Sequence, residues 1–137
     1  MDNDRVKHSI SVARRMVEIG KSYNLSNEEL EELFVLGLNH DIGYEFCAGR
    51  DHNVVGGNIL KRSNYKYWRE VYYHGVVQEE YSSLYLKILN TADMQVDKYG
   101  NVVGFEERLK DIKSRYGEDS VVYKRCVLLI EFIKSEV

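Results

Sequence analysis

Apolar residues recur along this chain at the three- and four-residue spacing of amphipathic helices. The first such stripe comprises Val6, Ile10, Ala13 and Val17. A second helix is predicted to begin after Ser26, whose side chain can form a capping box with Glu29, and to run to about Asp41. No segment keeps the two-residue period of a strand, so we expect no sheet.

Turn residues divide the rest of the chain into further helices. Gly43 is expected just after the second helix with a positive φ, and residues 43–50 are expected to form a loop. Asp51 is expected to cap a third helix. Helical spacing continues near 65–80, 82–97, 105–115 and 119–135, with a turn at 98–101. The prediction is an all-α fold, a compact bundle of about six or seven helices.

Composition indicates one globular domain. The 137 residues include no proline, ten scattered glycines and no repeat, so we predict a single domain over residues 1–137. The net charge of -3 argues against wide contact with nucleic acid, although a local basic pocket stays compatible with it. We expect no membrane segment and no secretory signal, hence a cytoplasmic protein in which Cys47 and Cys126 are free thiols.

Six polar residues lie on or beside apolar helical faces: His8, His40, Asp41, His52, His74 and Asp93. His8, for example, shares a strip with Val12 and Met16, and Asp93 follows Leu89. A buried carboxylate is costly unless it is paired or bound to a cation. One or two divalent metals would hold all six residues, and nitrogen and oxygen donors suit Fe, Mn, Co, Ni or Zn.

Each residue alone has a plainer explanation. A single histidine on an apolar face is more often a hydrogen-bonded core residue than a metal ligand. The pair His40-Asp41 could simply end a helix, where the helix dipole favours histidine but not aspartate. The ordered set is more specific than any of its parts.

In order and local context, these residues resemble the HD superfamily of metal-dependent phosphohydrolases, in the branch with two extra histidines. The matching segments are Arg5-Val-Lys-His8, Leu38-Asn-His-Asp-Ile-Gly43, His52-Asn-Val-Val-Gly56 and Leu89-Asn-Thr-Ala-Asp93. The resemblance covers residues 5–110, which would form the HD core, and leaves 111–137 as a C-terminal helical extension.

The resemblance implies a helical bundle around a dinuclear metal site. It assigns the first metal to His8, His40, Asp41 and Asp93, and the second to Asp41, His52 and His74. In this scheme Asp41 bridges the two metals, and Asp41 and His40 are the catalytic residues. The implied reaction is hydrolysis of a nucleotide or small phosphoester by a water that the metals activate.

Five residues are predicted to bind the substrate: Arg5, Tyr44, Arg50, Asn53 and Lys98. Arg5 lies one turn before His8, and Arg50 and Asn53 flank His52 near a helix N-terminus, which favours anions. Arg108 is a weaker candidate. The tyrosines at 65, 67, 72, 73, 81 and 85 could stack on a base, but packing within the fold is the favoured interpretation.

Two other functions remain open at this point: a di-iron oxygenase built on the same ligands, and a non-catalytic nucleotide-binding module. The segment 94–100 does not match that of symmetrical diadenosine tetraphosphate hydrolases, and the G-Y-P motif of cyclic-dinucleotide phosphodiesterases is absent. The expected partner is a small phosphorylated molecule, in the first place a nucleotide, and neither extended nucleic acid nor a membrane. The sequence leaves open whether the protein forms a homodimer.

Overall fold

The computed structural model describes residues 2–46 and 51–136, and in these residues the fold is all-α, as predicted. The elements are α1 (Asn3–Ser22), α2 (Asn27–Asn39), the 3-10 helix η1 (Ile42–Glu45), α3 (His52–Arg62), α4 (Trp68–Tyr73), α5 (Leu84–Asp93), α6 (Phe105–Tyr116) and α7 (Val121–Ser135). The described residues contain seven α-helices, within the predicted number, and no strand beyond an isolated bridge between Val96 and Val102.

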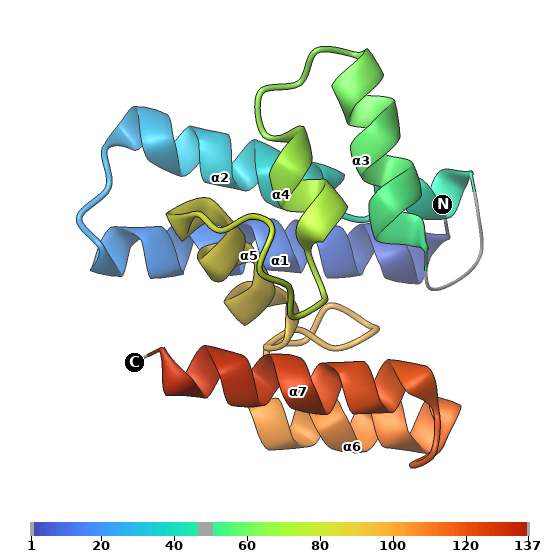
Figure 1. The fold of residues 1–137 in the computed structure, drawn as a ribbon. Coiled ribbons are helices and arrows are strands. Elements are labelled where there is room, and N and C mark those ends of the chain that lie inside the picture. The colour runs from blue at the N-terminus through green and yellow to red at the C-terminus, as the bar shows by residue number, and fades with distance from the viewer. Residues whose placement is uncertain (1, 47–50, 137) are drawn as a thin grey trace.

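Helices α1 and α2 pack along each other and form one side of the bundle (Figure 1). The predicted capping box is present: the Ser26 hydroxyl accepts from the Glu29 amide at 3.1 Å, and the Glu29 carboxylate accepts from the Ser26 amide at 3.0 Å. Gly37 lets the two backbones approach, since a Cβ there would lie 2.5 Å from the Cα of Ala13. This close packing holds the C-terminal end of α2 against α1.

The buried face of α1 differs from the first predicted stripe. Val6 is 42% exposed, whereas Val12 and Met16 are fully buried on the strip that also carries His8. Helix α1 contacts both α2 and α5, so its buried face lies between these two neighbours. Of the first predicted stripe, Ala13 is therefore buried and Val6 is not, and the strip that includes His8 faces the core.

The crossing of η1 and α3 corrects two further predictions. Gly43 does not have a positive φ, and it lies within η1 rather than in a loop. Glycine is needed there because a Cβ would meet the carbonyl oxygen of His52 at 1.9 Å. Asp51 precedes α3 but makes no capping hydrogen bond through its side chain. Close backbone contact, not a cap, places the start of α3.

Helices α4 and α5 are shorter than the segments predicted for them. Helix α4 ends at Tyr73 because His74 is extended, with ψ 151°, and Gly75 follows with φ +83°. Helix α5 begins after Ser83, whose hydroxyl accepts from the Leu86 amide. His74 thus directly follows α4, and Asp93 is the last residue of α5, so two of the predicted ligands lie at helix ends.

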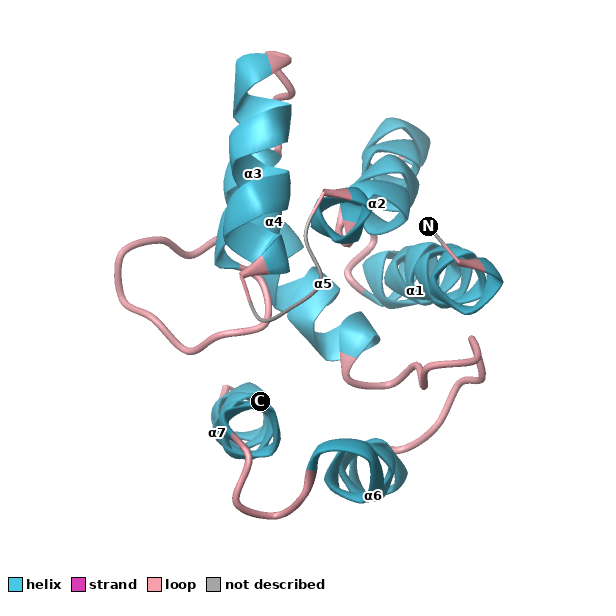
Figure 2. Ribbon diagram, turned by 90° about the vertical axis from the view of Figure 1, so that its right-hand side faces the viewer, coloured by secondary structure: helices cyan, strands magenta, loops and turns pink. Residues whose placement is uncertain are grey.

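Helices α6 and α7, with the turn between them, form a hairpin that we call the α6–α7 hairpin. It packs mainly within itself and through α7 on α5, and it lies apart from α1–α4 in both ribbon views (Figures 1 and 2). The main core lies among α1–α5 and includes Met16, Leu33, Leu36, Val71, Ile88 and Leu89. A second apolar cluster comprises Met94, Leu129, Ile130 and Ile133.

Candidate metal centre

The fold brings the six predicted ligands to one place. His40 and His74 follow the ends of α2 and α4, Asp93 is the last residue of α5, His52 is the first residue of α3, and His8 lies on α1. Helix ends thus converge on one point from four directions. Five of the six residues are buried and His52 is intermediate. Their roles as ligands stay a prediction, and the structure shows that the side chains lie close together.

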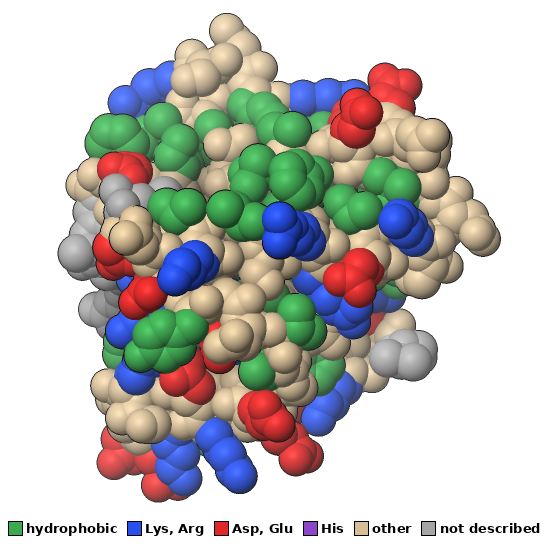
Figure 3. All heavy atoms as spheres, turned by 180° about the vertical axis from the view of Figure 1, so that it is seen from behind, with side chains coloured by type: hydrophobic (Ala, Val, Ile, Leu, Met, Phe, Trp, Pro, Cys, Tyr) green, Lys and Arg blue, Asp and Glu red, His purple; other side chains and the backbone are tan. Residues whose placement is uncertain are grey.

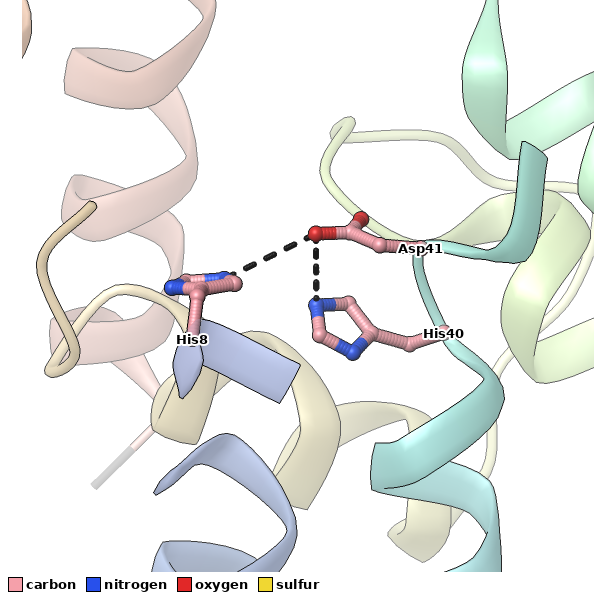
Figure 4. Close-up of side chains that lie close together, drawn as sticks. All are labelled: His8, His40 and Asp41. Atoms are coloured by element: carbon pink, nitrogen blue, oxygen red, sulfur yellow. Dashed lines mark ion pairs between the residues drawn. The ribbon is translucent and has the colours of Figure 1, made fainter. Parts of the chain in front are cut away.

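Asp41 lies between two groups of histidines. Its Oδ2 is 3.3 Å from Nε2 of His40 and 3.7 Å from Nε2 of His8 (Figure 4). Its Oδ1 is 3.2 Å from Nε2 of His52 and 3.5 Å from Nε2 of His74. Each carboxylate oxygen therefore faces its own pair of imidazole nitrogens, which is the geometry of a bridging carboxylate.

Asp93 completes the group around His8 and His40. Its Oδ1 lies 2.8 Å from Nε2 of His8 and 3.5 Å from Nε2 of His40. Two histidines and one oxygen from each of two carboxylates hence surround one space. This is the set that the sequence assigned to the first metal.

The backbone fixes the orientation of three imidazoles. Nδ1 of His40 lies 2.6 Å from the Gly37 carbonyl, and Nδ1 of His74 lies 2.6 Å from the Val71 carbonyl. Nδ1 of His8 lies 2.9 Å from the carbonyl of Asp97. A carbonyl only accepts, so each Nδ1 carries a proton and donates, which directs each Nε2 atom at the carboxylates.

Two of these nitrogens lack a partner. Among the described residues, Nε2 of His40 and Nε2 of His74 are buried without a hydrogen bond. A buried polar atom without a partner is costly, whereas an imidazole lone pair is a good ligand for a divalent metal. The orphaned nitrogens are the observation that best fits a metal at this site.

Charge at the centre also favours a cation. Burial raises the pKa of Asp41, but its histidine neighbours outweigh this effect and hold the pKa well below its usual range. The pKa of Asp93 is lowered in the same way by His40 and His8. Burial lowers the pKa of His40, yet the charges of Asp41 and Asp93 raise it well above its usual range. Burial lowers the pKa of His74.

Within the described part of the chain, three overlapping sets of donors are close enough to hold a metal ion. In each, the ligand atoms lie within 4.8 Å of one another. The sets are His8, His40 and Asp41; His40, His74 and Asp93; and Asp41, His52 and His74. Nitrogen and oxygen donors fit Fe, Mn, Co, Ni or Zn, and the shared Asp41 fits either one metal or two.

The centre forms the floor of a cavity of about 570 Å³. Of the predicted substrate residues, Arg5, Tyr44 and Lys98 line it. Asn53 does not, because its side-chain amide donates to the carbonyl of Tyr72 at 2.8 Å and ties α3 to α4. Arg50 and Cys47 lie outside the described residues.

Arg5, Tyr44 and His52 form a stack at the edge of the centre. The rings of Tyr44 and His52 are parallel, with centroids 4.1 Å apart, and the Arg5 guanidinium carbon lies 3.2 Å from the Tyr44 centroid. Burial, with the charge of Asp41, raises the pKa of Tyr44 to about 12, so its hydroxyl stays neutral. The Tyr44 ring supports His52 on one side and holds the Arg5 guanidinium at the cavity on the other.

Most of the residues of the opposite wall are not predicted from the sequence. The α6–α7 hairpin lines the cavity with Arg108, Arg115 and Arg125, of which Arg108 alone had been considered, and weakly. Their spacing on amphipathic helices is that of ordinary solvated arginines. Only the placement of the hairpin beside the centre distinguishes them, and no local signal in the sequence gives that placement.

The clustered tyrosines serve packing, as favoured from the sequence. The hydroxyls of Tyr67 and Tyr85 both donate to Glu32, at 2.5 and 2.9 Å, and the hydroxyl of Tyr81 donates to Glu70 at 2.6 Å. None of the six clustered tyrosines lines the cavity described here. Their hydrogen bonds connect α2 with α5 and with the start of α4, and α4 with the segment before α5.

Two further features of the described residues are the character of their helices and of their surface. None of the helices there combines the length and the apolar character needed to cross a membrane. The space-filling view from behind shows apolar side chains interspersed with charged ones (Figure 3).

Comparisons with known proteins support one family. A search of curated proteins found no match, and a search of solved structures found none either. A family model described as HD domain, a family of metal-dependent phosphohydrolases, matches residues 5–127, which reaches into α7. Because this match covers most of the 137 residues, the chain belongs to the HD domain family.

Proposed function

We propose that the protein is a metal-dependent phosphohydrolase that acts on a nucleotide or another small phosphoester. One observation carries the proposal: the two oxygens of Asp41 face separate pairs of histidine Nε2 atoms at the floor of a cavity that is bordered by cations. The membership of the HD domain family points the same way.

The six residues of the centre divide into two ligand sets. His8, His40, Asp41 and Asp93 would hold one metal, and Asp41, His52 and His74 a second. When bound, such divalent ions lower the pKa of a coordinated water and neutralise charge on phosphate oxygens. The Nδ1 contacts of His8, His40 and His74 keep their Nε2 atoms directed into the centre throughout.

The cavity provides the contacts for the substrate. The guanidinium of Arg5 lies at its edge, held by Tyr44, and would bind a phosphate oxygen of the substrate. Its volume of about 570 Å³ is that of a site for a small molecule. A nucleotide is the substrate we favour.

Hydrolysis of a nucleotide panel tests the proposal. The panel would contain mono-, di- and triphosphates, dinucleoside polyphosphates and cyclic dinucleotides, with the full chain reloaded with Mn, Fe or Co. Metal-free protein and Asp41→Ala serve as controls. We expect release of phosphate or nucleotide from one class of substrate, in loaded wild-type protein alone.

Two results would count against the proposal. Turnover that is equal in Asp41→Ala would place the reaction elsewhere on the chain. Protein that holds metal but hydrolyses no member of the panel would favour the oxygenase if it consumed oxygen, and a binding module if it bound nucleotides unchanged.

A further inference from the structure

The wall of the cavity opposite the metal centre is rich in arginine. Arg108 and Arg115 on α6 and Arg125 on α7 all line the same cavity as Asp41 and Asp93. These residues lie near or beyond residue 110, where the predicted core ends. They are thus separate from the six candidate ligands and from Arg5.

The positive charge of this wall is only partly compensated. Arg108 and Arg115 share one carboxylate, that of Asp111, at 3.6 and 2.8 Å. Among the described residues, the guanidinium of Arg125 makes no hydrogen bond or ion pair, although its side chain is half-buried. One carboxylate therefore pairs with two of the three guanidinium groups, and the third has no ion pair among the described residues.

Arg108 connects the wall to the metal centre. Its Nε donates to the backbone carbonyl of Asp93 at 3.3 Å, and the residue is only 8% exposed. Its Nη1 is buried and makes no hydrogen bond among the described residues, although it lies 3.6 Å from Oδ2 of Asp111. A charged N–H group that makes no hydrogen bond beside a cavity is a strong donor for an oxyanion.

The three arginines and the thiol of Cys126 line one cavity, although they come from two different helices. The hairpin therefore brings guanidinium groups from both α6 and α7 to the same wall.

We infer that Arg108, Arg115 and Arg125 form a second anion subsite, which receives a phosphate group other than the one at the metal centre. The inference rests on the proposed function and narrows it, because a substrate that fills both places carries at least two phosphate groups. Guanidinium groups suit this role, since they bind phosphate oxygens with paired, charged hydrogen bonds.

Binding of two inorganic probes tests the subsite without any turnover. Orthophosphate offers one phosphate group, and methylenediphosphonate offers two that no hydrolysis can separate. Isothermal titration of the full, Mn-loaded chain would give both affinities for wild-type protein, Arg125→Ala and Arg115→Ala. The matched control is Arg14→Ala, which removes an exposed arginine of α1 that does not line the cavity. Arg108 is left intact because it is buried and its loss endangers the fold.

We expect the wild-type protein and Arg14→Ala to bind the diphosphonate about tenfold or more tightly than orthophosphate. Arg125→Ala and Arg115→Ala should lose most of this preference and keep their affinity for orthophosphate. Chelation of the metal by the diphosphonate would be the same in all four proteins, so the difference between variants reports on the arginines.

Equal affinity of wild-type protein for the two probes would overturn the subsite, as would an unchanged preference in both arginine variants. Failure of the proposed function would show in a different experiment, as absent hydrolysis of the nucleotide panel. The two failures are therefore distinguishable.

Discussion

The charged and polar groups on the floor of the cavity are buried and oriented, whereas those of its α6–α7 wall are partly unpaired. At the floor, His40 and His74 are almost fully buried, and each is oriented by a carbonyl three residues earlier in the chain. In the wall, Arg115 is only partly paired and Arg125 makes no polar contact with the described residues. The floor is fixed before any ligand arrives, whereas the wall retains unused donors.

This difference follows from packing. The floor belongs to α1–α5, whose ends are set by close backbone contacts such as that of Gly43 with His52. The wall belongs to a hairpin that meets the core mainly through α7 and α5. A metal site needs ligands at defined positions, while recognition of a flexible phosphate chain tolerates adaptable arginines. The comparison predicts that changes in the floor affect the chemical step and changes in the wall affect binding.

The largest expected effect separates these two roles. Asp93→Asn keeps the shape of the side chain but removes its charge, so it should lower kcat roughly a thousandfold or more by weakening metal binding. Arg125→Ala should act mainly on KM, by about tenfold. Steady-state kinetics on a substrate found in the panel would check both, and a kcat for Asp93→Asn within about tenfold of wild type would break the comparison.

A backbone change tests how the floor is positioned. Gly43→Ala would place a Cβ 1.9 Å from the His52 carbonyl oxygen, so η1 and α3 must separate. We expect a loss of about 3 kcal/mol in the free energy of unfolding, measured by urea denaturation.

The control for this change is Gly104→Ala, because a Cβ there meets nothing within 4 Å. It should cost about 1 kcal/mol or less, the usual effect of alanine at a helix N-cap. Similar losses in the two variants would show that the η1–α3 crossing is not tightly packed.

The smallest expected effect concerns Glu32, which lies away from the floor and the wall. The hydrogen bond from Tyr67 is the main cause that lowers the pKa of Glu32 from 4.5, and that from Tyr85 adds to it. A lowered pKa stabilises the fold above pH 4.5, and this contribution is lost as the pH falls through the pKa of the folded state.

Glu32→Gln should therefore reduce stability by about 1 kcal/mol at pH 7. Urea denaturation at several pH values should show the difference from wild type shrinking below pH 4.5. Metal affinity should not change, because Glu32 does not line the cavity. A difference independent of pH would argue against the charged hydrogen bonds as its cause.

The residues of the floor can be predicted from the sequence more readily than those of the wall, for a physical reason. Histidine and aspartate on apolar helical faces are unusual, so His8, His40 and Asp93 stand out, and helical spacing suffices to predict an all-α fold. Arginine on a helix is ordinary, so Arg115 and Arg125 become noticeable only when the hairpin is placed beside the cavity.

Errors at helix ends have a similar origin. The position of Gly43 after α2 predicts a helix stop, but glycine is required there by contact with α3, which is a tertiary feature. Asn53 was grouped with the substrate residues for its place beside His52, yet its side chain faces the carbonyl of Tyr72 on α4. Position beside another residue in the sequence does not show on which side of a helix a polar side chain finds its hydrogen-bond partner.

The proposed role of Asp41 is to join two metal sites, and metal titration distinguishes one site from two. Metal-free wild-type protein, Asp41→Ala and His74→Ala would be titrated with Mn or Co by calorimetry, and circular dichroism would confirm their helicity. We predict two equivalents bound by wild type, one by His74→Ala and neither held tightly by Asp41→Ala. Two tightly bound equivalents in Asp41→Ala, or loss of both in His74→Ala, would contradict the claim.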